Sequence, residues 1–165
     1  MNITVEIATA SKEWSAYPEI DSALCGKITS MILSRYVNLK KVKQWELSIL
    51  LTDDANMQEL NAKFRQKDKV TNVLSFPDFD IKWDEIVDFV PDDKYMYLGD
   101  VAFGYTVIME EAKQNSIKFI EHFQHLLVHA ILHLIGYNHL DEDEAVVMES
   151  IETHILDELG VKSPY

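Results

Sequence analysis

The chain has 165 residues and 47% hydrophobic content, which is the length of one domain with enough apolar side chains to fill one core. A formal net charge of −13 argues against sequence-independent attraction to nucleic acid, and the single cysteine, Cys25, excludes an internal disulfide. Because neither a signal peptide nor an apolar run of the ~20 residues needed to span a membrane is evident, we expect one domain over residues 1–165, located in the cytoplasm.

Apolar periodicity predicts the elements in chain order. In the first half we expect a strand over 2–9, a helix over 20–36, a strand over 46–51, a helix from 52–54 through Phe64, and a strand over 71–77. In the second half we expect an exposed acidic loop over 78–93, a strand over 95–103, and helices ending near 115–116, near 134 and near 159. This mixture without strict alternation predicts an α+β or mixed α/β fold with one small mixed sheet packed by about five helices.

The stretch from Leu126 to His139 combines apolar residues with three imidazoles. A helix that is apolar nearly all round is buried, and a buried imidazole without a partner costs roughly 1–3 kcal/mol. His129 and His133 are four residues apart and therefore point the same way from one helix. Gly136 then permits a turn that returns His139 to the pair. We interpret the three histidines as ligands of a tetrahedral metal site with one open position, on a helix like that of zinc peptidases.

His125 extends the stripe and is an alternative third ligand by spacing alone. Three ligands along one straight helix span about 12 Å, which is too long for one ion with bonds near 2 Å, so we prefer His139. A competing interpretation is that these histidines are core or surface residues whose nitrogens bond to backbone carbonyls. His154 lies on a polar face, and we expect it to be exposed.

Residue 130 distinguishes this helix from that of the zinc peptidases. Those enzymes carry glutamate directly after the first histidine as the general base, whereas this chain has Ala130. Three neutral imidazoles leave the full charge of a divalent ion, which attracts an anion. The site therefore suits a phosphodiester better than an amide.

Three segments together resemble the YbeY family of bacterial metal-dependent endoribonucleases. They are the histidine motif at 129–139, the segment from Phe64 to Pro77, and Leu-Gly-Asp at 98–100. The resemblance extends over essentially the whole chain. It implies one Zn²⁺ per chain on His129, His133 and His139, and a functional role for Arg65. Ala130, Asn138 and Gly104-Tyr105 depart from the residues that the family usually carries.

The resemblance implies single-strand-specific cleavage of RNA in ribosomal RNA maturation at the small-subunit 3′ end and in ribosome quality control. We expect His129 and Arg65 to be catalytic, with Arg65 holding the phosphate and either water or the ribose 2′-hydroxyl as nucleophile. Lys63, Lys67 and Lys69 would extend the positive path beside Arg65. Expected partners are single-stranded RNA and the ribosome or small-subunit proteins, with neither DNA nor membrane. The alternatives are a zinc-dependent peptidase or amide hydrolase, and a non-catalytic ribosome-associated module with a structural metal.

Overall fold

Four strands form one mixed sheet in this computed structural model, which describes residues 1–91 and 93–165. The strands lie in the order β1-β2-β4-β3 and comprise β1 (Asn2–Thr9), β2 (Gln44–Thr52), β3 (Val73–Pro77) and β4 (Tyr95–Gly104). β1, β2 and β4 run parallel, and β3 pairs antiparallel to β4. β3 is therefore an edge strand.

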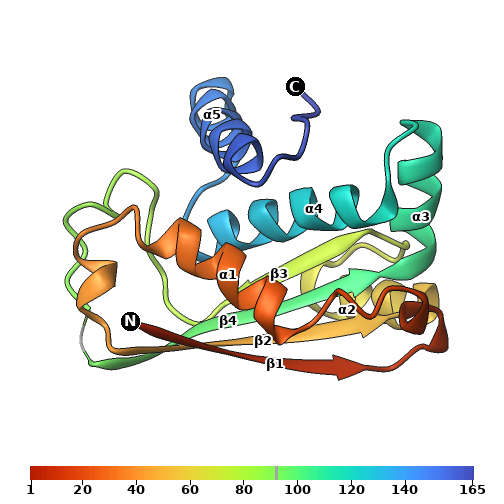
Figure 1. The fold of residues 1–165 in the computed structure, drawn as a ribbon, viewed down its shortest axis with the longest axis horizontal. Coiled ribbons are helices and arrows are strands. Elements are labelled where there is room, and N and C mark those ends of the chain that lie inside the picture. The colour runs from red at the N-terminus through yellow and green to blue at the C-terminus, as the bar shows by residue number, and fades with distance from the viewer. Residues whose placement is uncertain (92) are drawn as a thin grey trace.

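The sheet is packed by five α-helices in the part of the chain that the structure describes. They are α1 (Ser22–Leu33), α2 (Asp54–Arg65), α3 (Tyr105–Gln114), α4 (Phe119–Leu134) and α5 (Glu142–Glu158), with short 3₁₀ helices at Lys12–Ala16 and Leu39–Lys41. Figure 1 shows α1 and α4 over the same side of the sheet, with α5 beyond them. The histidine helix α4 is thus covered by the sheet on one side and by α5 on the other.

The alternation of side chains along the strands explains these layers. Ile49 and Val101 are buried in the main core, together with the apolar residues of α1 and α4. Leu74 and Ala102 point to the opposite face, where they form a small separate cluster with Met57 of α2. α2 therefore packs on the other side of the sheet from α4.

The observed architecture confirms the predicted α+β class, the small mixed sheet and the five helices. The first helix is shorter than expected at both ends. It begins after Pro18 because the Asp21 carboxylate accepts a hydrogen bond from the Leu24 amide (2.8 Å) and caps the helix there. α3 begins at Tyr105, directly after β4, with Gly104 as its N-terminal capping residue.

The expectation of a solvated loop over residues 78–93 was wrong for two of its apolar residues. Ile81 and Ile86 are buried in the main core, and Phe79 and Phe89 stack with ring centroids 5.3 Å apart. Residue 92 lies outside the described residues. The seven acidic residues of this segment dominate its composition, and its apolar residues follow no regular period, so the sequence pattern did not reveal their burial. Across the described parts of the chain, none of the helices is long and apolar enough to cross a membrane.

Candidate metal centre

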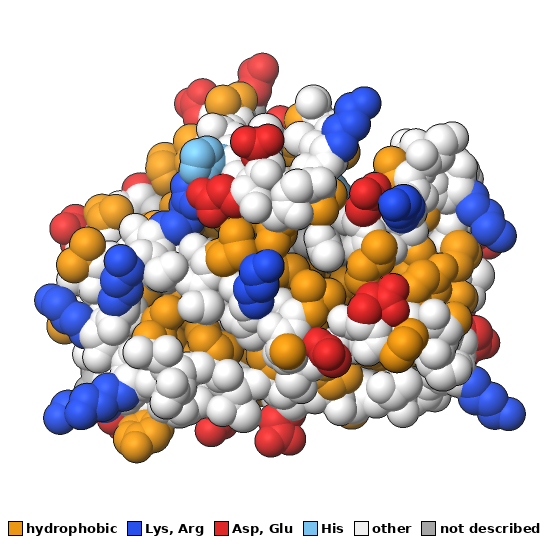
Figure 2. Space-filling model, in the orientation of Figure 1, with side chains coloured by type: hydrophobic (Ala, Val, Ile, Leu, Met, Phe, Trp, Pro, Cys, Tyr) orange, Lys and Arg blue, Asp and Glu red, His pale blue; other side chains and the backbone are white. Residues whose placement is uncertain are grey.

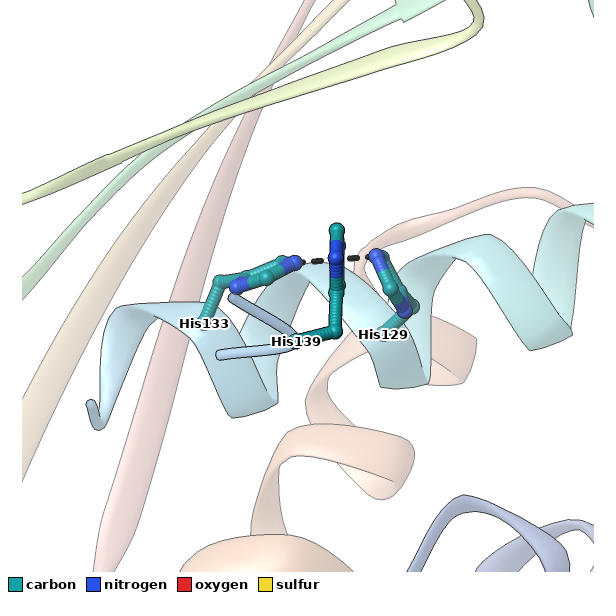
Figure 3. A group of neighbouring side chains, drawn as sticks. All are labelled: His129, His133 and His139. Carbon is teal, nitrogen blue, oxygen red and sulfur yellow. Dashed lines mark hydrogen bonds between the residues drawn. The ribbon is translucent and has the colours of Figure 1, made fainter. Parts of the chain in front are cut away.

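Three imidazoles meet at the carboxyl-terminal end of α4. His129 and His133 project from successive turns of the helix, and His139 reaches the same point from the segment that follows it (Figure 3). The Nε2 atoms of His129 and His133 are 2.9 Å apart, and one nitrogen from each of the three rings lies within 4.8 Å of the others. The structure thus brings together the three histidines that the sequence predicted.

Gly136 makes the return of His139 geometrically feasible. α4 ends at Leu134, and Gly136 has a φ of +101°, a conformation that residues with a side chain rarely adopt. A Cβ atom at this position would lie only 2.3 Å from the carbonyl oxygen of Ile81. The amide of Tyr137 donates to the carbonyl of Leu132 (3.0 Å) and completes the turn.

The partners of the other ring nitrogens fix which nitrogen of each imidazole faces the centre. His129 Nδ1–H donates to Glu152 Oε1 (2.6 Å), and His133 Nδ1–H donates to the carbonyl of Tyr137 (2.8 Å). In a neutral ring the remaining nitrogen, Nε2, then carries only a lone pair. Two lone pairs facing each other at 2.9 Å repel unless a cation lies between them.

This donor set fits a zinc ion. Two nitrogens bound to one zinc ion at about 2.0–2.1 Å lie about 3.3 Å apart in a tetrahedral arrangement, close to the observed separation. Burial lowers the pKa of His133 to about 4, so this ring is neutral and able to act as a ligand at physiological pH. His139 is exposed at the mouth of the centre and leaves an approach from solvent.

Glu152 is a component of the site that the sequence analysis missed. It lies on α5, is fully buried, and accepts hydrogen bonds from His129, His125 and Tyr165. Burial by itself raises the pKa of this carboxyl, but the hydrogen bonds from the two histidines outweigh it and hold the pKa at about 2. The available signal was its spacing, since Glu152 falls on the same helical face as Met148 and Ile155, which are buried.

The other histidines have separate roles. His125 Nε2–H donates to Glu152 Oε2 (3.1 Å), so this nitrogen is engaged and His125 does not join the three ligands. His154 is exposed, as expected, and lies 3.0 Å from Glu158. His122 is buried and contacts Glu111 at 3.2 Å.

A cleft of about 850 Å³ opens beside the three histidines. Its cationic lining comes from the segment that follows α2 and from the end of that helix: Arg65, Lys67 and Lys69. Lys63, predicted to extend this path, instead lies with its ammonium 5.2 Å from the centre of the Phe64 ring. Asp78 and Asp80 also line the cleft, so three cations and two carboxylates face it. The face drawn in Figure 2 carries acidic and basic side chains interspersed.

Arg65 is held at the edge of the cleft by two contacts. α2 ends at this residue because the next, Gln66, adopts a left-handed conformation with a φ of +53°. The Arg65 guanidinium donates to the carbonyl of Ser75 in β3 and stacks 5.0 Å from the ring of Phe76. The Ser75 hydroxyl in turn lies 3.4 Å from the carbonyl of Ala130, the residue after His129. β3 thus links the arginine to the histidine helix.

Comparisons of sequence and fold identify similar proteins. Residues 10–160 match the family described as Endoribonuclease YbeY. A protein of Chelativorans sp. (strain BNC1) named Endoribonuclease YbeY is 40% identical over 162 residues, which cover 98% of this chain and 93% of that protein. The solution structure of TM1509 from Thermotoga maritima is similar in fold, with a TM-score of 0.53, 19% identity, and coverage of 94% of this chain and 91% of that one.

Proposed function

Because this chain belongs to the YbeY endoribonuclease family, we propose that it is a metal-dependent hydrolase that cuts single-stranded RNA at the cleft beside α4. The observation that carries the proposal is the convergence of His129, His133 and His139 at one wall of a cleft that also contains Arg65. His129, His133 and His139 would hold one Zn²⁺ per chain. Bound there, the ion supplies Lewis acidity towards a phosphodiester and acidifies water to near neutral pH.

The protein groups around the ligands prepare this chemistry. The Glu152 carboxylate and the Tyr137 carbonyl hold the proton of His129 and of His133 on Nδ1, so both Nε2 lone pairs are directed to the centre. Neutral histidines leave the charge of a divalent cation available to an anionic substrate. His129 is catalytic in this proposal through its position as a ligand.

Arg65 is proposed to hold the scissile phosphate. A guanidinium cannot lose its proton in a protein and can donate two parallel hydrogen bonds to phosphate oxygens, so it stabilises the charge that develops in the transition state. Its contact with the Ser75 carbonyl uses part of its donor capacity and fixes its place along β3. The remaining donors are available on the exposed side of the cleft.

The proposed substrate is ribosomal RNA during maturation of the small-subunit 3′ end and in ribosome quality control, with the ribosome or its small-subunit proteins as partners in the cytoplasm. Lys67 and Lys69 extend the positive potential of Arg65 along the cleft. The net charge of −13 opposes binding of RNA elsewhere on the surface, which favours a substrate that a ribosomal partner delivers. Neither DNA nor membrane is an expected partner.

A zinc-dependent peptidase is the rival activity, and the position of Ala130 disfavours it. Zinc peptidases with this type of helix use a glutamate at that position as general base, whereas this chain has Ala130, which is fully buried in the core. The second rival is a ribosome-associated module whose metal only stabilises the fold.

One experiment separates these functions. Metal-loaded protein, chelator-treated protein and the Arg65→Ala variant are incubated with labelled single-stranded RNA, with the matching duplex and with a peptide library. We expect cleavage of single-stranded RNA that requires the metal and falls about 10²- to 10³-fold in the variant. RNA cleavage by protein shown to be metal-free would reject metal dependence, cleavage of peptides alone would favour the peptidase, and inactivity with unfolding on chelation would favour the structural metal.

A further inference from the structure

We infer that Glu152 is a positioning residue of the metal centre, which fixes the orientation and the tautomer of His129 and is itself held in place by His125 and Tyr165. The inference rests on the metal site of the proposed function. It extends that site from the three ligands at the end of α4 to a second layer contributed by α5 and by residues 161–165.

Both oxygens of Glu152 are occupied. Oε1 accepts from His129 Nδ1–H (2.6 Å), while Oε2 accepts from His125 Nε2–H (3.1 Å) and from the Tyr165 hydroxyl (2.8 Å). The side chain is fully buried between α4 and α5. A buried carboxylate is tolerated only when such hydrogen bonds replace its water, so the three donors explain how it persists there.

The contact between Glu152 and His129 determines which nitrogen of the imidazole carries the proton, in addition to joining α4 and α5. A neutral imidazole carries one proton, and only the nitrogen without that proton binds a metal. With an acceptor only 2.6 Å from Nδ1, the proton is held on Nδ1 and the Nε2 lone pair faces His133. Without the carboxylate the proton is free to occupy Nε2, the nitrogen that faces the other ligands.

Tyr165 holds the second oxygen from outside the helix pair. Its ring meets the ring of His125 edge-on, with centroids 5.9 Å apart and planes at 86°. The segment before it is tied to α5, since the hydroxyls of Thr153 and Ser163 are 2.9 Å apart and Val161 is buried. Residues 161–165 therefore close the side of the carboxylate that faces away from His129.

The experiment compares Glu152→Gln, Tyr165→Phe and the control Asp157→Asn, which removes an exposed carboxylate of the same helix. Glutamine keeps the shape of the side chain but replaces one acceptor oxygen with a donor. Zn²⁺ affinity is measured by competition with a chromophoric chelator. The tautomer of His129 in metal-free protein is read from imidazole ¹⁵N shifts.

We expect Zn²⁺ affinity to fall about 10- to 100-fold in Glu152→Gln, to fall less in Tyr165→Phe, and to stay unchanged in the control. His129 should be protonated at Nδ1 in the unmodified protein and become a mixture of tautomers in Glu152→Gln. A merely structural tie between the helices would not move this equilibrium.

Unchanged affinity and an unchanged His129 spectrum in a folded Glu152→Gln protein would overturn the inference. If that variant does not fold, Tyr165→Phe decides, because it removes one hydroxyl from the exposed side of the network; wild-type affinity and a wild-type His129 spectrum there would overturn the inference equally. If Glu152→Gln loses Zn²⁺ affinity as expected but the unmodified, metal-loaded protein does not cleave RNA, the proposed nuclease activity is rejected and the role of Glu152 stands.

Discussion

The Nε2 atoms of His129 and His133 lie 2.9 Å apart, while the Nδ1 atom of each ring is occupied by a different acceptor. The Nε2 atoms of the two rings therefore face the same point, where they could share one cation. A carboxylate from α5 orients one ring, and the backbone of the turn after α4 orients the other. Both acceptors, the Glu152 carboxylate and the Tyr137 carbonyl, belong to residues outside the proposed set of ligands.

Metal content tests the ligand set. The purified, metal-loaded protein should retain one equivalent of zinc per chain after dialysis, and His133→Ala should lose it, because two remaining imidazoles form an incomplete site. Elemental analysis of both proteins gives the ratio. His154→Ala, which changes an exposed histidine, should keep one equivalent. Full retention in His133→Ala would reject the assignment of His133 as a ligand.

Charge and geometry at residue 65 are separable by substitution. Arg65→Lys keeps the cation but loses the planar fork that holds two phosphate oxygens, so its kcat on single-stranded RNA should fall about tenfold or more, with a larger loss in Arg65→Ala. Steady-state kinetics supply kcat and KM, and zinc content should match the unmodified protein. Lys63→Ala serves as control because Lys63 lies over the Phe64 ring. Equal rates for arginine and lysine would show that charge alone is needed.

Substitution of Gly136 should affect stability and metal binding together. Gly136→Ala forces a side chain into a φ of +101° and into the carbonyl of Ile81, so we expect a loss of at least about 2 kcal/mol in the free energy of unfolding and weaker zinc binding. Urea unfolding and chelator competition measure the two effects. Gly160→Ala is a matched control, since Gly160 also has a positive φ of +72° but a Cβ there meets no atom within 4 Å. A smaller loss in Gly136→Ala than in the control would contradict the close approach of Ile81.

His122 should make the stability of the metal-free protein depend on pH. Burial lowers the pKa of this histidine below its ordinary value of 6.5, although Glu111 opposes the shift. As the pH falls below 6.5 the unfolded chain therefore takes up the proton first, and stability that is fully present above pH 6.5 is lost on acidification. The free energy of unfolding should depend less steeply on pH in His122→Gln. Between pH 6.5 and 5.5 its slope against pH should be smaller by up to about 1.4 kcal/mol per pH unit. Urea titrations at several pH values measure it, and parallel slopes for the two proteins would contradict the prediction.

The fold was predictable where periodicity was strong. The alternating residues of β1 and the apolar stripe of α4 gave the correct element type, and the range expected for β1 agrees with the structure. The start of α1 depended on the capping carboxylate of Asp21, which competes with Pro18 as a start signal. Ile81 and Ile86 were missed because burial within an irregular segment leaves no period in the sequence.

The candidate site was predictable to the extent that it is local. His129 and His133 follow from one helical turn, and Gly136 explains the return of His139. Glu152 could not be assigned, because its contact with His129 spans 23 residues and depends on how α5 crosses α4. The bond from Arg65 to Ser75 likewise arises from the placement of α2 beside β3.

The bond between Arg65 and Ser75 also bears on the behaviour of the protein at high concentration. β3 forms one edge of the sheet, and unpaired backbone groups on such an edge invite pairing with another chain. The guanidinium covers one of these acceptors and places a fixed positive charge beside it. Removing Arg65 therefore uncovers a backbone acceptor at which a second chain could pair. The oligomeric state of Arg65 variants should be measured together with their kinetics.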